Sequence, residues 1–169
     1  CALPAQPEGT LVRYQILAYP ADGGAAIVAD DGAVFSYLVD STPLPAWARE
    51  ARIYQIFPDR FSPGNGRFWN PVTHLSDIYG GTLRGIIDNL DYIADMGFNC
   101  IWINPFFPDQ THHGYHATDH FSINPRLGTL DDMQELVKIA HAKEIRLLLD
   151  FVGNHIGSGH AYFQDALAH

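Results

Sequence analysis

Residues 145–150 read Ile145-Arg146-Leu147-Leu148-Leu149-Asp150, an almost wholly apolar run that ends in a carboxylate. A strand that is covered on both faces has this composition, so the run predicts a strand of a parallel sheet. Two earlier runs of the same kind are each followed directly by a proline. They are Ile53-Tyr54-Gln55-Ile56-Phe57 and Cys100-Ile101-Trp102-Ile103-Asn104. We therefore expect three buried strands in this part of the chain.

Between these strands the apolar residues recur at helical spacing. One stripe starts after Thr82, a candidate helix cap, and stops at Gly97; its members are Leu83, Ile86, Ile87, Leu90, Ile93 and Ala94. A second helix is expected from Thr129, with Asp132 placed for a capping box and a core face of Met133, Leu136, Val137 and Ala140. This alternation of strand and helix implies parallel strands joined by right-handed crossovers.

Two α/β architectures fit this order of elements: a doubly wound sheet, and the first three βα units of a (β/α)₈ TIM barrel. No Gly-x-Gly-x-x-Gly pattern follows any of the three strands, which disfavours a dinucleotide-binding sheet. A complete barrel needs about 250 residues. In a chain of 169 residues, a barrel would therefore be incomplete.

The first 48 residues have a different pattern, which predicts β structure. Strands are expected at residues 11–19, 25–29 and 34–39, with a turn at Asp30-Asp31-Gly32. Pro43 and Pro45 then bar regular pairing, so residues 41–47 are expected to form a linker. We interpret residues 1–48 as the last strands of a small β-sandwich and its linker.

Composition excludes several classes of partner. The chain has 10 basic and 19 acidic residues, which gives a net charge of −9. Nucleic acids and anionic membranes select a positive face, so neither is expected as a partner. No apolar run approaches the roughly 20 residues of a membrane helix, and no signal-peptide pattern opens the chain. Only Cys1 and Cys100 are present, so a disulfide framework is excluded and the cellular compartment stays open.

Several ordered segments resemble the alpha-amylase family, glycoside hydrolase family 13. Residues 51–61 are similar to the first barrel strand of that family, most closely in its neopullulanase and maltogenic amylase branch. Residues 79–86 resemble the start of its first helix, and residues 99–107 resemble its second strand. The signature Asp-x-Val-x-Asn-His is matched at all four specified positions by Asp150-Phe151-Val152-Gly153-Asn154-His155. The resemblance implies the N-terminal part of the catalytic barrel in residues 49–155, with 156–169 opening a loop domain inserted after strand three.

The resemblance also implies roles for the signature residues. In the family, the residue that matches His155 hydrogen-bonds the sugar next to the cleaved bond, and the one that matches Asp150 orients the site. The residue that matches Asn154 is commonly a calcium ligand, and calcium prefers hard oxygen donors. Calcium is thus the candidate metal, and no organic cofactor is expected.

A second cluster, from His112 to His120, resembles the family's His-Gly-Tyr-x-x-x-Asp segment. By that resemblance Tyr115 stacks against a sugar, His113 is a nearby polar contact and Asp119 is a structural acceptor. His116 stands where many relatives carry aspartate, which puts any metal or hydrogen-bonding role of that position in doubt.

Other interpretations of the histidines and of the first loop remain open. Four histidines in nine residues also suit a zinc site with Asp119 as carboxylate ligand, although cysteine ligands are absent. Otherwise solvated positions are expected for His112, His116 and His120. In the loop of residues 59–70, Asn65 and Asn70 are weaker calcium candidates, and Trp69 either stacks on sugar or packs against its own barrel.

Retaining glycoside hydrolysis needs two carboxyl groups about 5 Å apart. The family takes these groups from strands four, five and seven, and this sequence stops soon after strand three. The resemblance therefore implies part of a retaining α-1,4-glucan hydrolase that is inactive alone. Its partners would be the glucan and the remainder of the barrel, from the same parent chain, a second chain or self-association. The alternatives are a transglycosylase or trehalose-forming enzyme of the same family, a non-catalytic carbohydrate-binding protein, and a metal-binding βα protein.

Overall fold

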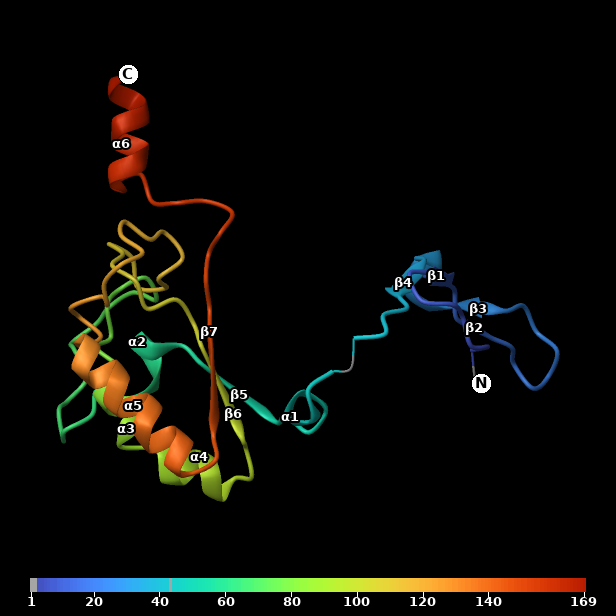
Figure 1. The fold of residues 1–169 in the computed structure, drawn as a ribbon, viewed down its shortest axis with the longest axis horizontal. Helices are drawn as coiled ribbons and strands as arrows, with labels where there is room; N and C mark the ends of the chain where they lie inside the picture. Colours follow the sequence, from blue (N-terminus) through green and yellow to red (C-terminus); the bar gives the residue numbers. More distant parts are fainter. Residues whose placement is uncertain (1–2, 43) are drawn as a thin grey trace. The chain divides into compact units, whose positions relative to one another are not determined.

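The computed structural model describes residues 3–42 and 44–169, so the predictions for Cys1 and Pro43 lie outside the described residues. The chain divides into two compact units, Cys1–Arg49 and Glu50–His169 (Figure 1). Each unit is considered by itself. No helix among the described residues is long and apolar enough to cross a membrane.

The N-terminal unit consists of two small antiparallel sheets. Strand β1 (Leu11–Tyr14) pairs with β4 (Phe35–Leu38), and β2 (Leu17–Ala18) pairs with β3 (Ile27–Val28). A 3-10 turn, η1 (Ala29–Gly32), follows β3, and α1 (Ala46–Arg49) lies where only a linker was expected. None of the described residues of this unit is buried. The described residues of this part therefore form no core of their own, and its assignment to a sandwich stays a prediction.

The C-terminal unit contains the three predicted parallel strands. They are β5 (Ile53–Ile56), β6 (Cys100–Ile103) and β7 (Arg146–Leu149), in the spatial order β5-β6-β7. Ile56 is opposite Ile103, and Ile103 is opposite Leu149, so the three strands end at the same level. The loops that follow them therefore leave from one edge of the sheet (Figure 1).

Helices cover one face of this sheet (Figure 1). They are α3 (Leu83–Ile87), α4 (Leu90–Asp95) and α5 (Leu130–Ala142), while the short α2 (Pro58–Phe61) follows β5 and α6 (Ala161–Ala168) ends the chain. The core lies between helices and sheet and contains Ile56, Leu83, Ile86, Leu90, Ile93, Ile101, Ile103 and Leu136. On the other face, Gln55 and Trp102 remain exposed.

The helix predicted after Thr82 is in fact two helices. Thr82 caps α3 as expected, since its side chain accepts from the backbone N–H of Gly85. The break falls at Asn89, whose side chain donates to the carbonyl of Gly85 at 2.8 Å. A side chain that bonds to the backbone in this way competes with the helical hydrogen bonds. The apolar stripe nevertheless faces the core: Leu83, Ile86, Leu90 and Ile93 are buried, and Ile87 and Ala94 are half-buried against them.

The second predicted helix start is confirmed. The Thr129 side chain accepts from the backbone N–H of Asp132, and the Asp132 side chain accepts from the backbone of Thr129, which completes a capping box at α5. Arg84 ties α3 to α5, because its guanidinium contacts Asp132 at 3.3 Å and also Glu135.

Candidate active site

The candidate site lies at the edge where β6 and β7 end. Tyr115, in the loop after β6, donates a hydrogen bond from its hydroxyl to Oδ2 of Asp150 at 2.9 Å. His155 Nε2 is 2.9 Å from the carbonyl oxygen of Tyr115 and acts as the donor. Nδ1 of the same ring is then an acceptor, and Nδ2 of Asn154 lies 3.2 Å from it. Four of the residues singled out from sequence thus belong to one hydrogen-bonded group.

Local contacts fix the position of Tyr115. Its backbone N–H donates to Nδ1 of His113 at 3.0 Å, so this histidine contacts the loop backbone. Gly114 has a φ of +81°, and a Cβ there would be 2.2 Å from the carbonyl oxygen of Pro105. The loop therefore passes against the end of β6 at a point where only glycine fits.

Burial affects the protonation of both side chains. It raises the pKa of the Tyr115 phenol, and the hydrogen bond to Asp150 adds to the shift. Burial lowers the pKa of His113, and this outweighs the opposing attraction of Asp109. Tyr115 is therefore a neutral donor and His113 a neutral acceptor, which is the pair of states that the hydrogen bonds require.

Asp109 organises this loop, although the sequence analysis did not single it out. Its carboxylate is buried and accepts from the backbone N–H groups of Thr111 at 2.6 Å and His116 at 2.8 Å. The guanidinium of Arg126 also holds the backbone of this loop, because it donates to the carbonyl oxygens of Asp109 and Thr111, each at 2.6 Å. Burial is the largest single influence and raises the pKa of this carboxyl, but the backbone N–H groups of Thr111 and His116, the Thr111 side chain and the His113 ring together lower it. No local sequence pattern distinguishes Asp109, because its donors are backbone groups.

The remaining histidines of the loop differ from one another. His116 is exposed, and its ring centroid lies 4.9 Å from that of His113 and 5.8 Å from that of His155. His112 is half-buried, with its ring 5.8 Å from Phe57. The expectation of a solvated His120 is wrong.

His120 packs against two phenylalanines and a second histidine. Its ring lies 5.3 Å from Phe107 and 5.4 Å from Phe151, and its Nδ1 is 3.3 Å from Nε2 of His160. The error arose because residues 151 and 160 approach this loop only in the folded chain.

Asp119 accepts hydrogen bonds from its own turn. Its carboxylate receives the backbone N–H of Phe121 at 2.9 Å and the hydroxyl of Ser122. The Ser122 and Phe121 hydrogen bonds lower the pKa of Asp119. This geometry agrees with a structural acceptor, although its importance for a site stays a prediction.

The donor sets for a metal are incomplete. Within residues 3–42 and 44–169, no group of three or more His, Cys, Asp or Glu side chains is placed to hold a metal ion. Asn154 is exposed and offers one amide oxygen, whereas calcium takes 6–8 oxygen ligands. The side chain of Asn70 donates to the carbonyl of Ile78 at 3.0 Å, and the backbone of Asn65 donates to Asp88 at 2.7 Å. Calcium at Asn154, Asn65 or Asn70 therefore stays a prediction.

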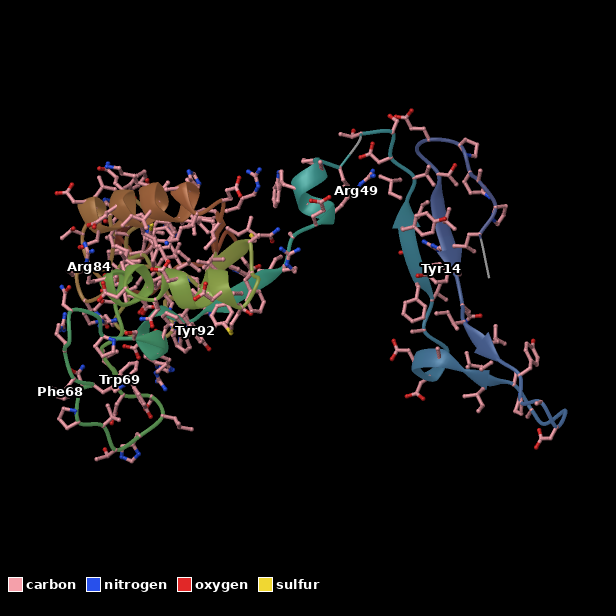
Figure 2. All side chains as sticks on the ribbon, turned by 90° about the horizontal axis from the view of Figure 1, so that it is seen from below. Tyr14, Arg49, Phe68, Trp69, Arg84 and Tyr92 are labelled. Atoms are coloured by element: carbon pink, nitrogen blue, oxygen red, sulfur yellow. The ribbon has the colours of Figure 1, made fainter. Side chains whose placement is uncertain are left out.

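The loop between α2 and α3 carries two exposed aromatic side chains, Phe68 and Trp69, which are 94% and 45% exposed (Figure 2). Trp69 therefore does not pack into the core of this unit. The base of the loop is held by Asp59, whose buried carboxylate accepts from the backbone of Tyr79 at 3.0 Å and Gly80 at 3.1 Å.

A cavity of about 430 Å³ opens beside the candidate site. Its lining is mainly polar and includes Asp109, Thr111, His116, His155 and Ser158. These residues come from the loop after β6 and the segment after β7. Hydroxyl, imidazole and carboxylate groups in one open hollow suit a ligand with many hydroxyl groups.

Comparison with known proteins identifies the family to which the chain belongs. The sequence matches the alpha-amylase catalytic domain over residues 55–169, and the chain belongs to the alpha-amylase family. The predicted resemblance is thereby confirmed.

Individual relatives support the predicted branch. The chain is 34% identical to neopullulanase 2 of Thermoactinomyces vulgaris over 95% of its own length and 29% of that protein. It is 41% identical to alpha-amylase 2 of Dictyoglomus thermophilum, over 76% of this chain and 23% of that protein. The chain thus spans about a quarter of the length of the curated relatives it matches.

Among solved structures, the chain is similar to the cyclic alpha-maltosyl-(1→6)-maltose hydrolase from Arthrobacter globiformis in complex with cyclic alpha-maltosyl-(1→6)-maltose. The TM-score is 0.68 at 40% identity, over 73% of this chain and 30% of that one. The α/β fold of the C-terminal unit is therefore that of an alpha-amylase catalytic domain.

Proposed function

We propose that this chain is the first part of the catalytic barrel of a retaining glycoside hydrolase that acts on α-1,4-glucans such as starch and maltodextrin. The observation that carries the proposal is the joining of the β6 and β7 ends by Tyr115, Asp150 and His155, at 2.9 Å in both contacts. Barrel enzymes place their chemistry at this edge of the strands. Membership of the alpha-amylase family supports the class of reaction.

The three βα units are proposed to be the first three of eight. The order β5-β6-β7 follows the chain, as it does in a barrel, and helices cover one face only. The exposed face carries Gln55 and Trp102 and would become the barrel interior. The remaining strands would come from the rest of the parent chain, a second chain or self-association. In the same scheme, residues 1–48 end a sandwich and residues 156–169 begin an inserted loop domain.

In substrate binding, Tyr115 would present its ring to one face of a glucose unit. His155 would accept a sugar hydroxyl at Nδ1 in place of the Asn154 amide, while its Nε2 stays on the carbonyl of Tyr115. Asp150 would orient Tyr115 through the phenol, and His113 would hold the backbone of the loop. Asp119 would serve as the structural acceptor of the next turn.

The catalytic carboxylates are proposed to lie in parent residues beyond this chain, so that the chain alone is inactive. A retaining reaction needs a nucleophile and an acid/base group about 5 Å apart. Calcium through Asn154 stays a prediction that needs several oxygen ligands from the same outside residues. It would supply structural cross-linking, and no step of the reaction is assigned to it.

Two alternative functions remain. A transglycosylase or trehalose-forming enzyme of the family would differ in acceptor sites, and its main product from maltodextrin would be a new glycoside. A non-catalytic carbohydrate-binding protein would bind maltodextrin without turning it over. The observation that favours hydrolysis is that the relatives described above are named as hydrolytic enzymes.

The test uses the full-length protein and maltodextrin. We expect reducing sugar to be released with the α-configuration first, as seen by proton NMR during hydrolysis. His155→Ala should lower kcat/KM by roughly tenfold, because a hydrogen bond to substrate is lost. His141→Ala removes an exposed histidine from the last turn of α5 and should leave kcat/KM unchanged. Equal kinetics for the two variants would remove His155 from the site, and β-configured product would exclude retention.

A further inference from the structure

Two segments that follow β6 and β7 run side by side beyond the candidate site. Three contacts join them, and these contacts follow one another in the same order along both segments. His155 Nε2 donates to the carbonyl of Tyr115 at 2.9 Å, and the backbone N–H of Gly157 donates to the carbonyl of Ala117 at 2.8 Å. His160 Nε2 lies 3.3 Å from His120 Nδ1. We call these three contacts the seam.

The seam needs an anchor at its far end. Only four residues separate His155 from His160, and Gly157 and Gly159 are among them. Glycine gives a free chain wide conformational freedom, so the first contact alone would hold the segment weakly. The approach is also close, since a Cβ on Gly157 would be 2.5 Å from the carbonyl oxygen of His116.

His160 is well suited to be that anchor. It is 3% exposed and is the N-cap residue of α6, where its Nδ1 accepts the backbone N–H of Tyr162 at 3.1 Å. A ring nitrogen that accepts an N–H carries no proton, so the proton of the neutral ring is on Nε2. His160 therefore donates to Nδ1 of His120, and the direction of the bond follows from the cap.

The same reasoning fixes the state of His120. Because its Nδ1 accepts, its own proton is on Nε2, which is buried without a partner among the described residues. Phe107 and Phe151 flank the ring, and the adjacent carboxylate of Asp119 is occupied by Phe121 and Ser122. The bond to His160 is thus the polar contact that the structure records for this ring.

We propose that His120 and His160 are a positioning pair, which locks the seam and thereby holds His155 and Tyr115 in the geometry that binds the glucan. The proposal rests on the proposed function for its substrate. Neither histidine lies at the ends of β6 and β7, so both would affect glucan binding only through His155 and Tyr115. His160 sets the path of the segment that carries His155, and His120 fixes the loop that carries Tyr115.

Two substitutions of His120 in the full-length protein separate positioning from packing. His120→Phe keeps a ring between Phe107 and Phe151 but removes the acceptor. His120→Gln keeps an amide oxygen that can accept from His160. We expect His120→Phe to raise KM for maltodextrin roughly five- to tenfold, the effect of one lost hydrogen bond, with a smaller change in kcat. His120→Gln should restore KM to within about twofold.

A spectroscopic measurement tests the pair independently of activity. In protein labelled with ¹⁵N-histidine, both rings should show the tautomer with the proton on Nε2. His120→Phe should also shift the ring signals of His155, whereas His141→Phe on α5 should not. A wild-type KM in His120→Phe, an unmoved His155 signal, or a proton on Nδ1 of His160 would each overturn the proposal. Absence of glucan turnover by the wild-type protein, with the tautomers and shifts as expected, would instead overturn the proposed function alone.

Discussion

Gly114→Ala tests how the loop of Tyr115 is held against the end of β6. The backbone at Gly114 has a φ of +81°, and an added Cβ would lie 2.2 Å from the carbonyl oxygen of Pro105. Ordinary carbon–oxygen contacts start near 3.4 Å. Either the loop or the peptide after β6 must therefore move by more than 1 Å, which is a shift comparable with a loss of hydrogen-bonding distance.

The expected cost has two parts. A residue with a Cβ in the left-handed region costs about 1–2 kcal/mol. Forcing additional volume into a closely packed place costs about 1–3 kcal/mol. Gly114→Ala should therefore lower the free energy of unfolding by roughly 2–5 kcal/mol, and the displaced loop should weaken glucan turnover as well.

Gly97→Ala is the matched control, because its φ is +86° and nothing lies within 4 Å of the added Cβ. It should show the backbone cost without the clash. Urea unfolding of both variants in the full-length protein, followed by tryptophan fluorescence, gives the difference as a shift in midpoint at constant m value. If Gly114→Ala is no less stable than Gly97→Ala, the close approach to Pro105 does not exist as described.

The remaining predictions concern the core, the helix cap and the loop anchor. Leu136→Ala removes a fully buried side chain of α5 and should cost roughly 2–5 kcal/mol in chemical unfolding. Thr129→Ala should cost about 1 kcal/mol, since it removes the N-cap. The hydrogen bonds from Thr129 lower the pKa of Asp132 in the folded protein. The stability that they give is therefore present above the ordinary carboxyl pKa of about 3.9 and is lost as the pH falls through the lower pKa of the folded state. Unfolding measured as a function of pH should show a weaker acid dependence in Thr129→Ala than in the wild-type protein. Asp109→Asn places an amide N–H₂ against a backbone N–H donor, so it should lower the free energy of unfolding by about 1–3 kcal/mol. It should also lower kcat/KM for glucan. The exposed control Asp131→Asn should change neither value.

The elements of the C-terminal unit were predictable because their signals are local. Three apolar runs predicted β5, β6 and β7, and the Thr129–Asp132 spacing predicted the capping box. Prediction failed at Asn89, where one helix became two. The apolar spacing there continues through the break, so only the hydrogen bond from Asn89 to Gly85 reveals it.

The candidate site was predictable only where a motif marks it. Tyr115, Asp150 and His155 were named from the sequence. The Tyr115 hydroxyl meets the Asp150 carboxylate, and the His155 ring meets the backbone carbonyl of Tyr115. Asp109 and His160 were missed, because one holds backbone N–H groups and the other makes its contact forty residues away. Such contacts form because the register of the parallel strands brings distant loops to one edge of the sheet. A local sequence pattern therefore does not predict them.

His116 shows why a changed side chain need not disturb this loop. The resemblance places aspartate at this position in many relatives, yet here the loop is fixed through the backbone N–H of His116, which Asp109 accepts. The imidazole itself is exposed and faces the cavity beside His155, with 5.8 Å between ring centroids. The backbone of His116 holds the loop, while its imidazole contacts the rings of His113 and His155 and lines the cavity, so a change of this side chain alters the surface that a ligand would meet. If the proposed function holds, we therefore expect differences in specificity from the relatives to arise first at His116, and only later in the residues that hold the loop.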